Sequence, residues 1–198
     1  MTKLTLDDIA DLRAYERERE DFRRSVIAVK KRRRIHVGPF VTLLFENRQT
    51  VRFQIQEMAR AEKTFTDEAI QTELDVYNPL VPDPAHLAAT LFIELTTDAE
   101  LRGWLPKLVG IERHVVVRIG EGSDLTEVRG TVDVDHEKQL TREEITASVH
   151  YVHFAFRPEQ VQGFGSGPAR LVVDHPAYAH EMMLSDENRA ELGADLAG

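Results

Sequence analysis

The stretch Gly38–Met58, GPFVTLLFENRQTVRFQIQEM, contains the two patterns on which the predicted fold depends. Its first half belongs to an apolar run over residues 37–45, which is typical of a buried strand. Its second half changes to helical spacing, and the helix is expected to run to Glu62. Either Asn47 or Thr50 can serve as the N-cap, because both side chains can accept a hydrogen bond from a helix amide. A buried strand is therefore predicted to lead directly into a helix.

Polar side chains gather where this strand meets this helix, and a rigid junction of that kind is a common place for a site. The candidate ligand-binding residues are Glu46, Arg48, Gln54, Gln56 and Glu57. Arg48 could hold an anionic group through two hydrogen bonds, and Glu57 could act as a base or as the partner of Arg48. The alternative is structural: Asn47 caps the helix, and the other side chains are solvated or form internal ion pairs.

Upstream of this stretch, apolar residues recur at steps of three and four over residues 6–34, which predicts one long N-terminal helix. Glu16, Arg19 and Arg23 fall inside the same apolar stripe. A charged side chain in such a stripe is unfavourable unless it is paired or lies at the rim. The helix is therefore expected to pack against another subunit or a polar groove, or to leave its middle turns in solvent.

Downstream, the pattern of the sequence changes. Residues 1–110 are predicted to be rich in helix, residues 111–185 are predicted to be rich in strand, and a last helix is expected over residues 186–196. Within the second half, the glycine-rich segment 163–167 is predicted to form a turn before a strand. Short turns favour antiparallel pairing, and nothing around residue 110 has the composition of a linker. The expected fold is α+β, a single domain over residues 1–198 with a mixed, largely antiparallel sheet, flanking helices and the long N-terminal helix.

Composition excludes several chemistries. The 198 residues include no Cys, so the chain cannot form a disulfide, a thiolate metal site or an iron–sulfur cluster through its own thiolates. No apolar run approaches the roughly 18–20 residues that span a bilayer, and the start, MTKLTLDDIADL, lacks the apolar core of a secretory signal. A cytoplasmic protein without contact with the membrane is the expectation.

The net charge of −9 is unevenly distributed, because one short run is strongly basic. That run consists of Lys30, Lys31, Arg32, Arg33 and Arg34. It could bind an anionic partner or nucleic acid through phosphate contacts. The alternative is that these cations favour the C-terminus of the predicted helix. The acidic balance of the whole chain and the lack of a nucleic-acid motif argue against nucleic acid.

Metal ligands are present but poorly spaced. The possible donors are Asp133, Asp135, His136, Glu137, His150, His153, Asp174, His175 and His180. Neither Glu-x-x-His nor His-Glu-x-x-His occurs, so the common di-iron and zinc-protease motifs are missing. At three-residue spacing on a strand, His150 and His153 point to opposite faces. The sequence therefore predicts no metal site and no cofactor.

Three segments, LLFENRQTVRFQIQEM, ELDVYNPLVP and ATLFIEL, resemble a bacterial family known as domain of unknown function 3501. The segments VIAVKKRRRIHVGP and VVDHPAYAHEMMLSDENR are similar to it as well, so the resemblance covers nearly the whole chain. It implies no catalytic residue, cofactor or fold. Genes of the family neighbour those of rubrerythrin-like and iron–sulfur redox proteins, which implies an oxidative-stress or electron-transfer context.

Three functions follow as expectations. The first is a non-catalytic accessory protein in a bacterial redox or oxidative-stress pathway. This protein is expected to be a homodimer and to bind a redox or iron–sulfur protein. The second is a small-molecule-binding protein or enzyme that uses Glu46, Arg48 and Glu57. The third is nucleic-acid binding through Lys30–Arg34. The lack of a catalytic motif favours the first, and whether residues 38–58 line a pocket or an interface would separate the first from the second.

Overall fold

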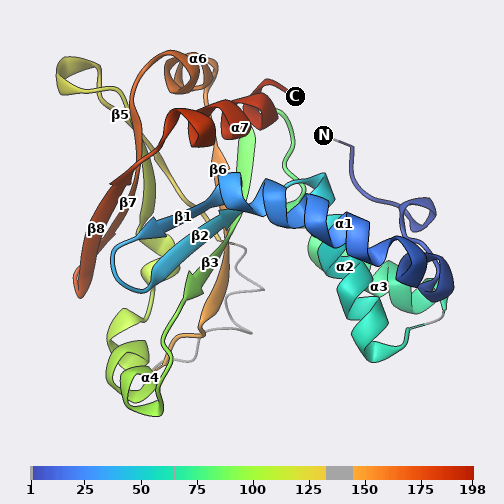
Figure 1. The fold of residues 1–198 in the computed structure, drawn as a ribbon. Coiled ribbons are helices and arrows are strands. Elements are labelled where there is room, and N and C mark those ends of the chain that lie inside the picture. Colours follow the sequence, from blue (N-terminus) through green and yellow to red (C-terminus); the bar gives the residue numbers. More distant parts are fainter. Residues whose placement is uncertain (1, 65, 133–144) are drawn as a thin grey trace.

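The computed structural model describes residues 2–64, 66–132 and 145–198. It contains two four-stranded sheets, with α1, α2 and α3 on one side of them and with α6 and α7 close together at one end (Figure 1). The predicted α+β class is confirmed. The strands form two sheets instead of one, and every strand pair within the described residues is antiparallel.

The first sheet has the strand order β1-β2-β3-β6, with β1 (Arg34–Val37), β2 (Val41–Phe45), β3 (His86–Ile93) and β6 (Val149–Ala155). The second has the order β5-β4-β7-β8, with β4 (Val115–Ile119), β5 (Thr126–Arg129), β7 (Ala169–His175) and β8 (Tyr178–Met183). The apolar run over residues 37–45 was predicted to be one strand, but a turn at Gly38 ends β1 at Val37 and β2 begins at Val41.

The helices are α1 (Leu12–Arg33), α2 (Arg48–Glu62), α3 (Asp67–Tyr77), α4 (Asp98–Trp104), α6 (Pro158–Ser166) and α7 (Asp186–Ala197). The predicted helix over residues 6–34 begins later, because the side chain of Asp11 caps α1 and a separate short turn precedes it. The turn predicted over residues 163–167 is wrong, since most of it continues α6.

One core lies between the two sheets, and a second lies beneath the helices. Alternate residues of β3, such as Leu87 and Leu91, point into the core between the sheets, together with Val117 and Leu171 of the second sheet. Ala88, on the opposite face of β3, packs in the second core with residues of α2 and α3. Both faces of the first sheet are therefore covered, and its outer face is the floor of the layer that contains α1–α3.

The charged stripe of α1 faces α2. Glu57 of α2 receives two hydrogen bonds from Arg19, both of 2.8 Å, and a third of 2.7 Å from the hydroxyl of Tyr15. Glu16 of α1 likewise pairs with Arg60 of α2. Arg19 and Glu16 are therefore paired with α2 of the same chain, and Glu16 and Arg23 are exposed to solvent, as the second alternative predicted for the middle turns.

Candidate functional site

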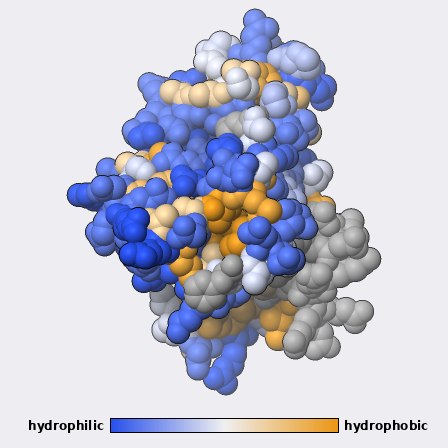
Figure 2. All heavy atoms as spheres, turned by 90° about the vertical axis from the view of Figure 1, so that its right-hand side faces the viewer, coloured by the Kyte–Doolittle hydropathy of each residue, from blue (hydrophilic) through white to orange (hydrophobic). Residues whose placement is uncertain are grey.

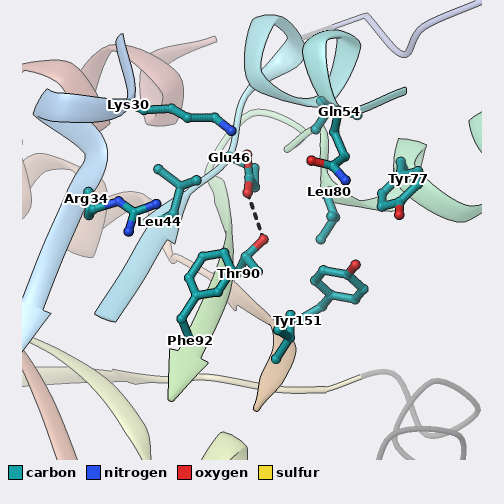
Figure 3. Close-up of a pocket in the computed structure, with 12 residues that line it drawn as sticks. Lys30, Arg34, Leu44, Glu46, Gln54, Tyr77, Leu80, Thr90, Phe92 and Tyr151 are labelled. Atoms are coloured by element: carbon teal, nitrogen blue, oxygen red, sulfur yellow. Dashed lines mark hydrogen bonds between the residues drawn. The ribbon is translucent and has the colours of Figure 1, made fainter. Parts of the chain in front are cut away.

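A cavity of about 250 Å³ lies between the outer face of the first sheet and the helical layer (Figure 3). Its lining residues are Lys30, Arg34, Leu44, Glu46, Val51, Gln54, Tyr77, Leu80, Thr90, Phe92, Val149 and Tyr151. We refer to it as the Glu46 cavity. Strands supply its floor, and α1, α2 and the end of α3 supply its walls. Its polar and apolar side chains are mixed, which is typical of a site for a small molecule.

The register of the first sheet builds the floor. Leu44 pairs with Thr90, and Thr90 pairs with Tyr151, so these three side chains form one row across β2, β3 and β6. Phe92 and Val149 form the next row. Because side chains alternate between the two faces of a strand, all five point away from the core between the sheets and toward the helices.

Glu46 stands at the centre of the cavity with its side chain nearly buried, at 8% exposure. Its backbone amide donates to the carbonyl of Ala88 at 2.8 Å, which extends the pairing of β2 by one residue. One carboxylate oxygen accepts a hydrogen bond of 2.7 Å from the Thr90 hydroxyl, and the other accepts one from Thr50. The two hydroxyls hold the carboxylate in place and leave further acceptor positions on both oxygens.

Two cations line the same cavity. The Lys30 amine points toward Glu46 in Figure 3, and it also lies 5.4 Å from the centre of the Phe53 ring. Burial lowers the pKa of Lys30, the Glu46 carboxylate opposes that shift, and Arg34 adds to it. Arg34 pairs with Glu94 at 3.1 Å and lies 5.5 Å from the centre of the Phe92 ring. The cavity thus carries positive charge on one side of a buried carboxylate.

Two phenols lie across the cavity from the cations (Figure 3). Burial raises the pKa of Tyr151 to about 12, and the neighbouring Tyr77 and Glu46 act in the same direction. The Tyr151 hydroxyl therefore stays protonated at neutral pH, and it remains a hydrogen-bond donor.

The structure brings two of the five predicted ligand-binding residues into the cavity. These are Glu46 and Gln54, and the side chain of Gln54 reaches down from α2 (Figure 3). The other three contact the segment before α1 or α1 itself. Arg48 pairs with Asp8, Gln56 is buried and hydrogen-bonded to both backbone groups of Ala10, and Glu57 binds Arg19 and Tyr15. Arg48 and Glu57 form the internal ion pairs of the structural alternative, whereas the buried Gln56 is neither solvated nor in an ion pair.

The contacts of Glu57 predict a pH dependence of stability. The hydrogen bonds from Arg19 lower the pKa of Glu57 from 4.5 to about 2, and Tyr15 adds to the shift. The folded state therefore favours the ionised carboxylate, so its stabilisation is complete above pH 4.5 and is lost as the pH falls toward 2. Because solvent screens a side chain that is 27% exposed, we expect a loss of about 1–2 kcal/mol.

Chemical denaturation of the Glu57→Gln variant between pH 2 and pH 7 measures this contribution. The variant should be less stable than the wild type at pH 7, and the difference should shrink as the pH falls. Glu20, an exposed acid in the middle of α1, is the matched control, since Glu20→Gln should change the stability by less than about 0.5 kcal/mol. A Glu57→Gln difference that does not change with pH would contradict the assignment.

The basic run does not form a continuous surface. Lys30 and Arg34 line the Glu46 cavity, and Lys31 is exposed. Arg32 and Arg33 pair with Glu191 of α7, and Arg33 is buried. Most of this positive charge is therefore matched by carboxylates of the chain itself, which weakens the case for phosphate contacts along the run.

Of the possible metal ligands, Asp133, Asp135, His136 and Glu137 lie outside the described residues. Across residues 2–64, 66–132 and 145–198, no group of three or more His, Asp or Glu side chains is placed to hold a metal ion. His150 instead contacts the hydroxyl of Thr146, and His175 contacts the carbonyl of Val109. Nor does any helix within the described residues have the length and apolar character to cross a membrane.

Several cavity residues were not predicted, namely Thr90, Phe92, Tyr151 and Tyr77. For Thr90 and Phe92, a signal existed in the alternation of residues 89–93, ATLFI, because a strand with Thr and Phe on one face has a second, less apolar side. Tyr77 and Tyr151 are 74 residues apart, and each follows an ordinary apolar pattern. Only the tertiary fold brings these two phenols to one place.

The face with α1–α3 is largely hydrophilic, and an apolar area lies near its middle (Figure 2). Single exposed apolar residues are normal on a protein surface, but an apolar area among polar groups is typical of a binding surface. The helical side of the molecule therefore carries both the Glu46 cavity and accessible apolar atoms.

Comparison with known proteins places the chain in one family. The family model described as "Protein of unknown function (DUF3501)" matches residues 3–196. The chain is also similar to the crystal structure of a novel protein of unknown function from Burkholderia pseudomallei K96243. The two sequences are 37% identical, the match covers 98% of this chain and 100% of the other chain, and the TM-score is 0.89. No curated protein matches. The resemblance predicted from the sequence is confirmed: this chain belongs to the DUF3501 family of proteins of unknown function.

Proposed function

We propose that this chain is a small-molecule-binding protein whose ligand occupies the Glu46 cavity. One observation carries the proposal: a nearly buried carboxylate and a half-buried amine line one cavity, and within the described residues neither forms an ion pair. An ion pair elsewhere in this chain, such as Arg19 with Glu57, brings the two groups to 2.8 Å. No such ion pair joins Lys30 to Glu46, although both side chains line the same cavity.

Unpaired charges in a cavity are unfavourable in the absence of a ligand. Moving a charged group from water into a protein interior is strongly unfavourable unless a partner or hydrogen bonds compensate. Glu46 has two hydroxyl donors, which compensate part of that free energy. A ligand with complementary groups would supply the rest, so the arrangement favours binding over a purely structural role.

The experiment blocks the cavity without altering the core. Gln54 is exposed on α2 and lines the cavity, so Gln54→Trp should fill its opening. Gln49 is a matched control on the same helix, because its side chain contacts Ser25 of α1 instead of the cavity. A fragment library is screened against the wild type by ligand-observed NMR. Fragments that bind should lose at least about tenfold in affinity for Gln54→Trp and keep it for Gln49→Trp.

Two results would contradict the proposal. Fragments that bind Gln54→Trp as tightly as the wild type would place their site elsewhere. A library that yields no fragment with a Kd below about 1 mM would show that the cavity has no measurable affinity for small molecules.

The other functional expectations remain predictions. A non-catalytic accessory role in a bacterial redox or stress pathway rests on the family resemblance and on the lack of Cys in the chain. The homodimer and the cytoplasmic location are likewise predictions. Size-exclusion chromatography with light scattering tests the homodimer, and a monomer at micromolar concentration would contradict it.

A further inference from the structure

The Glu46 cavity presents two unlike charges to the same volume. Glu46 offers carboxylate oxygens that already accept one hydroxyl each and can accept more. Lys30 offers ammonium protons for which the described residues supply no hydrogen-bond acceptor, and Arg34 lies next to it. A ligand that carries only one charge would satisfy one of these groups and leave the other in the same unfavourable state.

We infer that the ligand is an α-amino acid with an apolar side chain, an inference that rests on the proposed binding function. The ammonium group of the ligand would donate to Glu46, and its carboxylate would accept from Lys30 and Arg34. The two charged groups of the ligand are attached to one carbon atom, which suits two protein charges that face one small volume. Such a ligand is neutral overall, so it compensates both protein charges without changing the net charge of the cavity.

Like-charge repulsion separates this class from its simpler relatives. A plain carboxylic acid that reaches Lys30 also approaches the Glu46 carboxylate, and two anions close together in a poorly solvated site repel. A plain amine that reaches Glu46 approaches Lys30 and Arg34 in the same way. Of these three kinds of ligand, the amino acid is the one that places each of its charges beside a protein charge of opposite sign.

The rest of the lining suits an apolar side chain of modest size. The apolar lining residues are Leu44, Val51, Leu80, Phe92 and Val149. The volume of about 250 Å³ corresponds to about eight water molecules at ~30 Å³ each, which admits a ligand of roughly ten non-hydrogen atoms. Leucine and similar amino acids fall in this range. The side-chain amide of Gln54 can hydrogen-bond a ligand group that does not reach the two charges.

The test compares leucine with two compounds that each lack one of its charges. 4-Methylpentanoate retains the carboxylate and the side chain, and 3-methylbutylamine retains the amine and the side chain. Isothermal titration of the wild type should give leucine at least about a tenfold lower Kd than either compound, since each lacks one charge-assisted interaction.

Two variants reverse the selectivity. In Glu46→Gln, leucine should lose at least about tenfold in affinity, while 4-methylpentanoate should bind more tightly than it binds the wild type. In Lys30→Met, leucine should lose affinity by a similar factor, while 3-methylbutylamine should gain it. A variant that merely weakened the fold would lower all three affinities together, so the opposite changes identify charge recognition. If Glu46→Gln fails to fold, Lys30→Met and the wild-type comparison still decide the result.

The outcomes separate this inference from the proposed function. If 4-methylpentanoate or 3-methylbutylamine binds the wild type as tightly as leucine does, the amino-acid assignment is overturned, and the cavity remains a binding site. If none of the three compounds binds but library fragments bind in a manner blocked by Gln54→Trp, the assignment is overturned and the proposed function stands. If fragments do not bind either, both fail.

Discussion

Replacing Arg33 with Met is expected to destabilise the protein by about 3–5 kcal/mol, the largest effect that we predict for a single side chain. Arg33 ends α1 and is 1% exposed. Its guanidinium donates to the backbone carbonyls of Phe45 at 2.9 Å and Glu46 at 3.3 Å, and it pairs with Glu191 at 3.0 Å and with Asp195. One side chain thus joins α1 to the end of β2 and to α7.

The magnitude follows from what the substitution leaves behind. Without the guanidinium, the carboxylate of Asp195 remains buried without that cation, and both carbonyls lose the hydrogen bonds that Arg33 donates to them. Met has a similar length and fills much of the same space. The decrease in the free energy of unfolding therefore arises more from the lost charge and hydrogen bonds than from lost packing. Because the Glu46 carbonyl belongs to the residue at the centre of the cavity, the variant should also weaken ligand binding.

Urea denaturation measures the free energy of unfolding of the variant. Lys31, two residues earlier in the same helix turn, is exposed, so Lys31→Met is the matched control with an expected change within about 0.5 kcal/mol. Adding Asp195→Leu to Arg33→Met should recover part of the loss, since it removes the buried carboxylate that lost its partner. A loss below about 1 kcal/mol for Arg33→Met would show that the ion pairs contribute little.

The second large effect is expected at the turn between β1 and β2, where Gly38→Ala should destabilise the protein by about 2–5 kcal/mol. Gly38 has a φ of +77°, a conformation that disfavours an L-residue by about 1–2 kcal/mol. A Cβ at this position would lie 2.5 Å from the Tyr178 hydroxyl oxygen and 2.6 Å from a ring carbon of His180. Relieving these contacts requires both side chains of β8 to move, at about 1–3 kcal/mol.

The clash matters because Tyr178 joins the two sheets. Its hydroxyl donates to the carbonyl of Val37 at 2.6 Å and accepts from the amides of Phe40 and Val41. The turn of the first sheet is therefore held by the edge strand of the second. A displaced Tyr178 would leave a buried carbonyl and a buried amide without their partner, which adds to the loss of stability.

Thermal unfolding followed by circular dichroism tests this expectation. Gly193 lies inside α7, and a Cβ added there would meet no atom within 4 Å, so Gly193→Ala should stabilise the protein by about 0.5–1 kcal/mol. The same chemical change should thus have opposite signs at the two positions. Equal effects of Gly38→Ala and Gly193→Ala would mean that the turn and Tyr178 adapt freely.

Local patterns predicted the parts of the structure that depend on local physics. Asn47 caps α2 as expected, since its side chain accepts a hydrogen bond from the amide of Thr50. The apolar run behind Glu46 is buried as predicted. α6 was missed because glycines at 163 and 165 weaken the helical pattern, and the stabilising contact is the burial of Phe164 between elements distant in sequence.

The candidate site was predicted only in part. Glu46 and Gln54 lie on the two sides of the strand–helix junction, and both reach the cavity because the chain direction there is set locally. Arg48 and Glu57 belong to the same junction, but they turn to α1 and the segment before it. Helical spacing places Gln54 on a different face of α2 from Arg48 and Glu57. Which of these faces lines a cavity depends on the positions of α1 and the sheet.

Local sequence features suffice to predict the α+β class, the buried strand that leads into a capped helix, and the exclusion of thiol chemistry. Each depends on side-chain periodicity, on a cap within a few residues, or on composition, all of which act without distant contacts. The shared cavity of Lys30, Glu46, Thr90 and Tyr151 and the burial of Arg33 depend on long-range packing. Their meeting requires the pairing of β2, β3 and β6 and the packing of α1 over that sheet, which are long-range contacts that no local pattern specifies.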